Sequence, residues 1–111
     1  MYWNKPVETM DPSEMRRMQT GRLKDLVTRV YRQVPFYRDL MQAKGLLPED
    51  IKSLGDISKL AVTTKQDMRD NYPYGLFAVP PSEIVRIHAS SGTTGKATVV
   101  GYTTRDIGIW A

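Results

Sequence analysis

With 111 residues, the chain is shorter than a typical domain of about 150 residues, which excludes a large multidomain enzyme within this length. Hydrophobic residues make up 41% of the sequence, which excludes a disordered chain, and the lack of cysteine excludes disulfides, thiolate metal sites and a cysteine nucleophile. The net charge of +4 comes from the first third, because residues 1–38 carry 8 basic and 4 acidic side chains against 8 of each in residues 39–111.

The first predicted helix begins at Pro12, directly after an acidic cap. Asp11 can accept a hydrogen bond from a free backbone N–H of the first turn, and Pro12 is favoured at the first helical position. Glu14 is placed to reach back to the backbone of the cap residue. Gly21 weakens the middle of this helix, so the pattern allows a kink near Thr20.

An apolar stripe and a polar face follow along the same helix. The apolar side chains recur at steps of three and four residues within an arc of about 140°, so we expect a core-facing stripe of Leu23, Leu26, Val27, Val30, Tyr31 and Val34. On the opposite face, Asp25 stands four residues before Arg29, the favourable order for a helical ion pair. A basic helix can bind nucleic acid, but the interleaved acids and the missing aromatic platform favour a solvated face here.

The next segment predicts short helices joined by turns. A second helix is expected over residues 36–44, closed by Gly45 in the left-handed conformation, and a further helix should start at Pro48. The aromatic side chains of this region are expected to serve packing rather than ligand stacking: Phe36, Tyr37, Tyr72, Tyr74 and Phe77.

One more helix is predicted before the chain becomes extended. Thr64 and Asp67, three residues apart, have the spacing of a helix cap, and Pro73 ends any helix that follows. No set of catalytic groups is recognisable up to this point. We therefore expect residues 1–82 to form a mainly helical first unit.

Two strands and a connecting loop are predicted in the last third. Residues 83–88 and 98–102 are rich in β-branched side chains and read as strands, and residues 104–111 predict the start of an amphipathic helix. The loop between the strands contains Ser90, Ser91, Gly92, Thr93, Thr94, Gly95 and Lys96. Residues 83–111 thus form a second unit, and the fold class is α/β.

The composition of this loop fits a polyphosphate. Glycines let backbone N–H groups converge, hydroxyls donate to oxygens, and the Lys96 ammonium offsets negative charge. The Walker pattern Gly-x-x-x-x-Gly-Lys-Ser/Thr fails, because Ser90 stands where glycine is required and Ala97 where a hydroxyl would bind magnesium. Serine, threonine and glycine also fill loops without a ligand, so composition leaves phosphate binding and a plain loop both open.

A resemblance to a known family favours phosphate binding. The stretch Ser90-Ser91-Gly92-Thr93-Thr94-Gly95-Lys96 resembles the phosphate loop of the acyl-adenylate-forming superfamily, Ser/Thr-Ser-Gly-Thr-Thr-Gly-x-Pro-Lys. The segments 29–37, 63–69, 71–78 and 87–91 are similar to the phenylacetate-coenzyme A ligase branch, so the likeness spans nearly the whole chain. Ala97 departs from the proline usual in that branch. Lys96 lies at a variable position and is not the essential lysine that such enzymes carry in their C-terminal domain.

The resemblance implies an α/β fold and an ATP-dependent ligase activity. The chain would be an N-terminal fragment of the large domain of an adenylate-forming ligase, with several short helices and a β-hairpin that carries the phosphate loop. Such enzymes join a carboxylic acid to coenzyme A through an acyl-adenylate, using ATP and Mg²⁺. The resemblance implies that the loop Ser90 to Lys96 holds the ATP phosphates; it identifies no catalytic residue and no metal ligand in this chain.

The remaining expectations concern partners and location. The partners implied are a small carboxylic acid, ATP, coenzyme A and the remainder of the ligase chain, with self-association through open strand edges. No nucleic acid or membrane partner is expected, since the chain has no long apolar run, and the cytoplasm is the expected location. The segment alone is expected to be inactive. The alternatives are a separate phosphate- or nucleotide-binding module and a protein-interaction module. His88, beside the loop, is expected to be structural.

Overall fold

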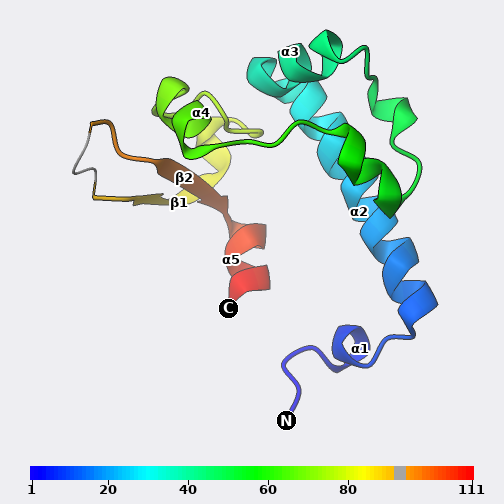
Figure 1. Ribbon diagram of the computed structural model, residues 1–111. Coiled ribbons are helices and arrows are strands. Elements are labelled where there is room, and N and C mark those ends of the chain that lie inside the picture. The colour runs from blue at the N-terminus through cyan, green and yellow to red at the C-terminus, as the bar shows by residue number, and fades with distance from the viewer. Residues whose placement is uncertain (92–94) are drawn as a thin grey trace.

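The computed structural model describes residues 1–91 and 95–111, with helices first and strands last (Figure 1). The elements in chain order are α1 (Lys5–Glu8), α2 (Pro12–Gln33), α3 (Pro35–Ala43), the 3-10 turns η1 (Pro48–Asp50) and η2 (Leu54–Lys59), α4 (Lys65–Asp70), η3 (Pro81–Glu83), β1 (Ile84–Ala89), β2 (Val99–Thr103) and α5 (Thr104–Trp110). Helices with a two-stranded antiparallel sheet agree with the predicted α/β class.

Helix α2 begins where the sequence predicts. The Asp11 carboxylate accepts a hydrogen bond from the backbone N–H of Ser13 at 2.8 Å, which caps the helix. The hydroxyl of Ser13, followed by its N–H, holds the pKa of Asp11 below its ordinary value. The Glu14 side chain makes no recorded bond to the cap, so that part of the prediction is wrong. The helix runs unbroken through Thr20.

A small apolar core joins α2, α3 and the residue after η1. Val27, Met41 and Ile51 form a buried cluster, and Val34 is fully buried between the two helices. Leu26 contradicts the predicted stripe, because the residue is 54% exposed. The core contacts only one side of the predicted arc, and Leu26 lies toward the other side of α2.

Two turns shape the chain after α2. Helix α3 begins at Pro35, one residue earlier than predicted, because proline suits the first helical position. It ends at Ala43, one residue earlier than predicted. The predicted left-handed turn at Gly45 is confirmed by its φ of +64°, and the N–H of Leu46 donates back to the carbonyl of Met41 at 2.9 Å. The helix expected from Pro48 is a single 3-10 turn, η1.

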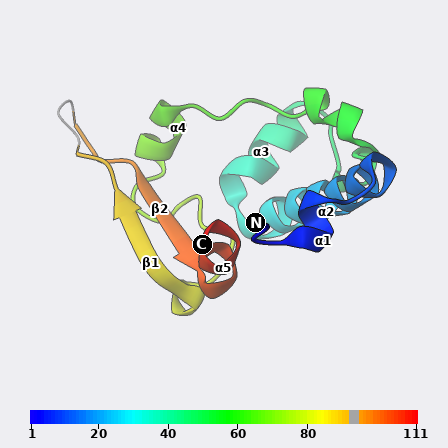
Figure 2. The same cartoon turned by 90° about the horizontal axis from the view of Figure 1, so that it is seen from below.

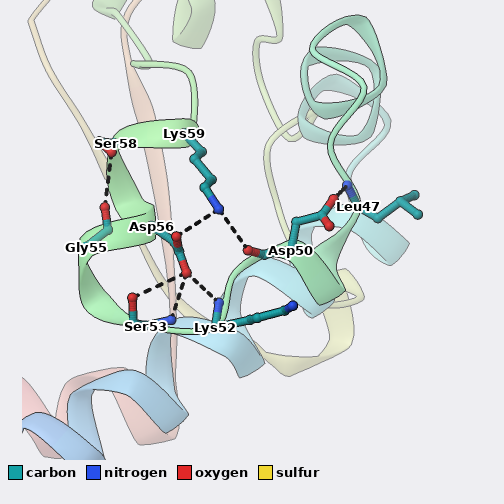
Figure 3. Close-up of polar contacts among 8 residues, drawn as sticks. All are labelled: Leu47, Asp50, Lys52, Ser53, Gly55, Asp56, Ser58 and Lys59. Atoms are coloured by element: carbon teal, nitrogen blue, oxygen red, sulfur yellow. Dashed lines mark hydrogen bonds and ion pairs between the residues drawn. The ribbon is translucent and has the colours of Figure 1, made fainter.

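The 3-10 turn η2 was not predicted, and one carboxylate organises it (Figure 3). Asp56 accepts from the backbone N–H groups of Lys52 and Ser53 at 2.8 and 2.9 Å and pairs with the Lys59 ammonium at 2.8 Å. Lys59 also donates to the carbonyl of Asp50 at 3.4 Å. The Lys59 side chain, followed by the two N–H groups, holds the pKa of Asp56 far below its ordinary value. Asp56 is thus a structural cap.

The hairpin rests on the segment that precedes it. β1 and β2 each begin one residue later than predicted and pair antiparallel, with Ile87 opposite Gly101. The ring of Phe77 lies so close to Gly101 that a Cβ built there would be 2.6 Å from the ring atom Cζ. The packing role predicted for Phe77 is therefore confirmed. Helix α4 has the predicted cap, with Thr64 and Asp67 bonded to each other's backbone N–H groups.

Helices α2 and α3 lie on one side of the molecule and the hairpin on the other, with α4 beside the hairpin (Figures 1 and 2). The Cα radius of gyration is 16.1 Å, against roughly 13 Å for a compact domain of this length. The accessible surface of 8170 Å² likewise exceeds the roughly 6200 Å² usual for this mass. The described residues therefore leave more surface uncovered than a closed domain does.

Candidate functional site

The hairpin holds the predicted phosphate loop at the end remote from α5 (Figure 1). Ala89 and Val99 are the last paired residues before the loop. Beyond them, the N–H of Ser90 donates to the carbonyl of Thr98 at 3.0 Å, which adds one rung to the ladder. The loop is therefore anchored on both sides by the sheet.

Side chains reinforce this rung. The hydroxyl oxygen of Ser90 accepts from the backbone N–H of Thr98 at 3.1 Å and bonds to the Thr98 hydroxyl at 2.8 Å. Ser90 is thus placed by three bonds to one residue. The partnership of Ser90 with Thr98 depends on the register of the two strands, which the residue pattern does not determine.

The other predicted loop residues differ in what the structure describes. Gly92, Thr93 and Thr94 lie outside the described residues. Ser91 and Lys96 are exposed, as is Gly95. The φ of Gly95 is +128°, a conformation that glycine adopts far more readily than any other residue. The exposed ammonium and hydroxyl are available to an anion from solvent.

His88 belongs to an aromatic cluster formed by the two strands of the hairpin and α5. Its ring meets Tyr102 edge-on at a centroid distance of 5.0 Å and Trp110 at 5.6 Å, and Tyr102 stacks on Trp110 at 5.5 Å. These contacts fit the structural role that was expected for His88, through ring packing in place of a hydrogen bond. The sequence signal that was missed is an aromatic residue at the end of β2 followed by one in α5.

A groove of about 830 Å³ lies between α2 and the hairpin. Its lining includes apolar side chains from both sides, among them Leu26, Phe77 and Ile109. Charged groups line it as well: Arg22, Asp25, Arg29, Lys65, Arg105 and Asp106. The predicted Asp25–Arg29 ion pair is absent, since the one ion pair recorded in residues 1–91 and 95–111 joins Asp56 and Lys59. Leu26 is exposed because it faces this open groove.

The described residues assemble no metal site. Within them, no group of three or more histidine, cysteine, aspartate or glutamate side chains lies close enough to hold an ion. The Mg²⁺ implied by the resemblance therefore has no cluster of three such side chains to bind it in this part of the chain. No helix in the described part is long and apolar enough to cross a membrane.

Comparison with known proteins gives a consistent set of relatives, although no family model matches the chain. The chain is 54% identical over 106 residues to a phenylacetate-coenzyme A ligase of Aromatoleum evansii, covering 96% of this chain and 24% of that protein. It is 49% identical over 111 residues to the phenylacetate-coenzyme A ligase of Thermus thermophilus, covering 100% of this chain and 25% of that protein. The chain therefore spans about a quarter of the length of these curated relatives.

The fold is also found in a solved ligase. A crystal structure of 2-hydroxyisobutyryl-CoA ligase, in complex with 2-HIB-AMP and CoA in the thioesterification state, matches with a TM-score of 0.83 and 35% identity. The match covers 95% of this chain and 23% of that one. The helices and hairpin described above are therefore an arrangement that occurs within an adenylate-handling ligase.

Proposed function

Because the chain is 54% and 49% identical to two phenylacetate-coenzyme A ligases, of whose length it spans about a quarter, we propose that it forms part of an ATP-dependent, AMP-forming ligase. The first half-reaction joins a carboxylate oxygen of a phenylacetate-like acid to the α-phosphorus of ATP, and the bond to the β-phosphate breaks to release pyrophosphate. In the second, the coenzyme A thiol loses its proton and attacks the acyl carbon, so that AMP leaves and a thioester forms.

The proposed part of this chain is to hold the ATP phosphates. The loop Ser90 to Lys96 would surround the β- and γ-phosphates with hydroxyls and backbone N–H groups, so that pyrophosphate departs in line. Support comes from the anchored base of the loop at Ser90, from the glycine conformation of Gly95 and from the exposed Lys96 ammonium. The observation that carries the proposal is the 54% identity to phenylacetate-coenzyme A ligases across nearly the whole chain.

The division of labour follows the two units. We propose that residues 1–82 act as a helical scaffold and that residues 83–111 present the loop. ATP and coenzyme A are substrates of the complete ligase, and Mg²⁺ would be held by residues elsewhere in it. The principal partner is the rest of the ligase chain, which would cover the apolar lining of the groove beside Leu26; a second copy is a further partner through the open sheet edges.

The experiment is exchange of labelled pyrophosphate into ATP, dependent on phenylacetate, by a complete ligase that carries this segment. Replacing Lys96 by alanine should raise the KM for ATP and slow adenylate formation, because the ammonium no longer offsets the negative charge of the phosphates. Lys24→Ala, an exposed lysine on α2, is the matched control and should leave both values unchanged. A Lys96→Ala enzyme that behaves like the control would contradict the proposed role of that lysine.

A second measurement separates the ligase proposal from a self-sufficient module. The 111-residue segment alone should form no acyl-adenylate, because the acid and adenine pockets are proposed to lie elsewhere. Tight ATP binding by the segment alone, measured by calorimetry, would favour an independent nucleotide-binding module instead.

A further inference from the structure

Thr98 makes three bonds to Ser90 across the base of the loop. Its carbonyl accepts from the Ser90 N–H at 3.0 Å, its own N–H donates to the Ser90 hydroxyl oxygen at 3.1 Å, and its hydroxyl bonds to the same oxygen at 2.8 Å. The first bond continues the sheet ladder. The other two converge on one side-chain atom, which a ladder does not require.

The convergence has a consequence for the serine proton. A hydroxyl has one hydrogen to donate and two lone pairs that accept. The N–H of Thr98 fills one lone pair of the Ser90 oxygen. In the hydroxyl pair either oxygen can be the donor; when Thr98 donates, its O–H fills the second lone pair. The hydrogen of Ser90 is then the one bonding capacity left, and it must point away from Thr98.

We propose that Thr98 is a positioning residue that turns Ser90 into an oriented hydrogen-bond donor for a phosphate oxygen of ATP. This inference rests on the proposed phosphate-binding function of the loop. A serine with a free lone pair can rotate its hydrogen to other acceptors, including water. By filling both lone pairs, Thr98 keeps the donor ready before ATP arrives, so that no hydroxyl rotation is needed during binding.

A purely structural role of Thr98 makes a different prediction. If its hydroxyl only closes the hairpin, its loss should increase hydrogen exchange in β1 and β2 but leave ATP binding unaffected once the enzyme is folded. If it acts through Ser90, its loss should weaken ATP binding, and this effect should vanish when Ser90 lacks its hydroxyl. The two roles are therefore separable in a double-mutant cycle.

The test uses phenylacetate-dependent exchange of pyrophosphate into ATP by the complete ligase. Thr98→Val removes only the hydroxyl and keeps the shape, and it should raise the KM for ATP about 5-fold, the effect of one ordinary hydrogen bond. Thr98→Ser keeps a hydroxyl at this position, so its KM for ATP should stay within about 2-fold of that of the parent enzyme, a smaller change than the one expected for Thr98→Val. The double variant Ser90→Ala/Thr98→Val should match Ser90→Ala alone. Thr104→Val, an exposed threonine at the start of α5, is the control for the exchange itself and should change nothing.

The possible results distinguish a failure of the inference on Thr98 from a failure of the proposed function. The inference would be overturned if the Thr98→Val enzyme were active with an unchanged KM for ATP. It would also be overturned if the effects of Thr98→Val and Ser90→Ala on this KM were fully additive. Either result would leave the proposed function unaffected. An unsubstituted ligase that shows no exchange would overturn both. Should Thr98→Val not accumulate as folded protein, Thr98→Ala carries the same expectations, because it also keeps the backbone bonds.

Discussion

Replacing Gly101 by alanine should loosen the hairpin through a steric clash. The added Cβ would lie 2.6 Å from Cζ and 2.8 Å from Cε2 of Phe77, and 3.1 Å from Cδ1 of Ile84. Side-chain carbons in contact prefer about 3.5 to 4.0 Å, so the Phe77 ring must move away from β2. Overpacking of this kind costs about 1 to 3 kcal/mol.

The assay is hydrogen exchange of the β2 peptide in a complete ligase chain. A cost of that size should speed exchange through local opening by about 5- to 150-fold. Gly108→Ala is the matched control, since nothing lies within 4 Å of its added Cβ and alanine favours helix α5. Adding Phe77→Leu to Gly101→Ala should recover part of the protection by removing the ring edge. Equal exchange in the Gly101 and Gly108 variants would refute the steric argument.

Two further predictions test the helical unit. Ile51→Ala should destabilise the core by about 2 to 5 kcal/mol, because Ile51 is 1% exposed, whereas Ile57→Ala, at 60% exposure, should have little effect; thermal unfolding of both variants compares them, and equal losses would contradict the core assignment. The pKa of Asp56 is lowered from its ordinary value of 3.8, so the charged carboxylate stabilises the folded state. This contribution is fully present at pH values above 3.8 and is lost as the pH falls below 3.8. Proteolysis of the 52–59 segment should therefore rise in acid, and Asp56→Asn should reproduce this rise at pH 7, while Asp39→Asn, an exposed carboxylate, should not.

The sequence was most informative where the physics is local. The caps at Asp11 and Thr64, the glycine turn at Gly45 and the two strands were all predicted, because each depends on residues within a few positions of one another. The Asp56 cap has the same spacing from Ser53 as Asp67 has from Thr64, so its signal was present but was not used.

The missed features depend on contacts between distant segments. The exposure of Leu26 follows from which part of α2 meets the core, and helical periodicity cannot determine that. The bonds between Ser90 and Thr98 need the strand register, and the stacking of Trp110 needs the angle at which α5 leaves β2. The loop motif was recognisable from the sequence through its resemblance, whereas the residue that orients its first hydroxyl was not.

The aromatic cluster of the hairpin and α5 supplies a natural optical reporter. Only two tryptophans occur in the sequence; Trp3 is 77% exposed near the N-terminus, and Trp110 stacks on Tyr102, the partner of Arg86 across the sheet. With Trp3 replaced by phenylalanine, the one indole left in this segment is that of Trp110, which contacts the C-terminal end of β2. Its emission would then report local opening of the hairpin without any attached dye.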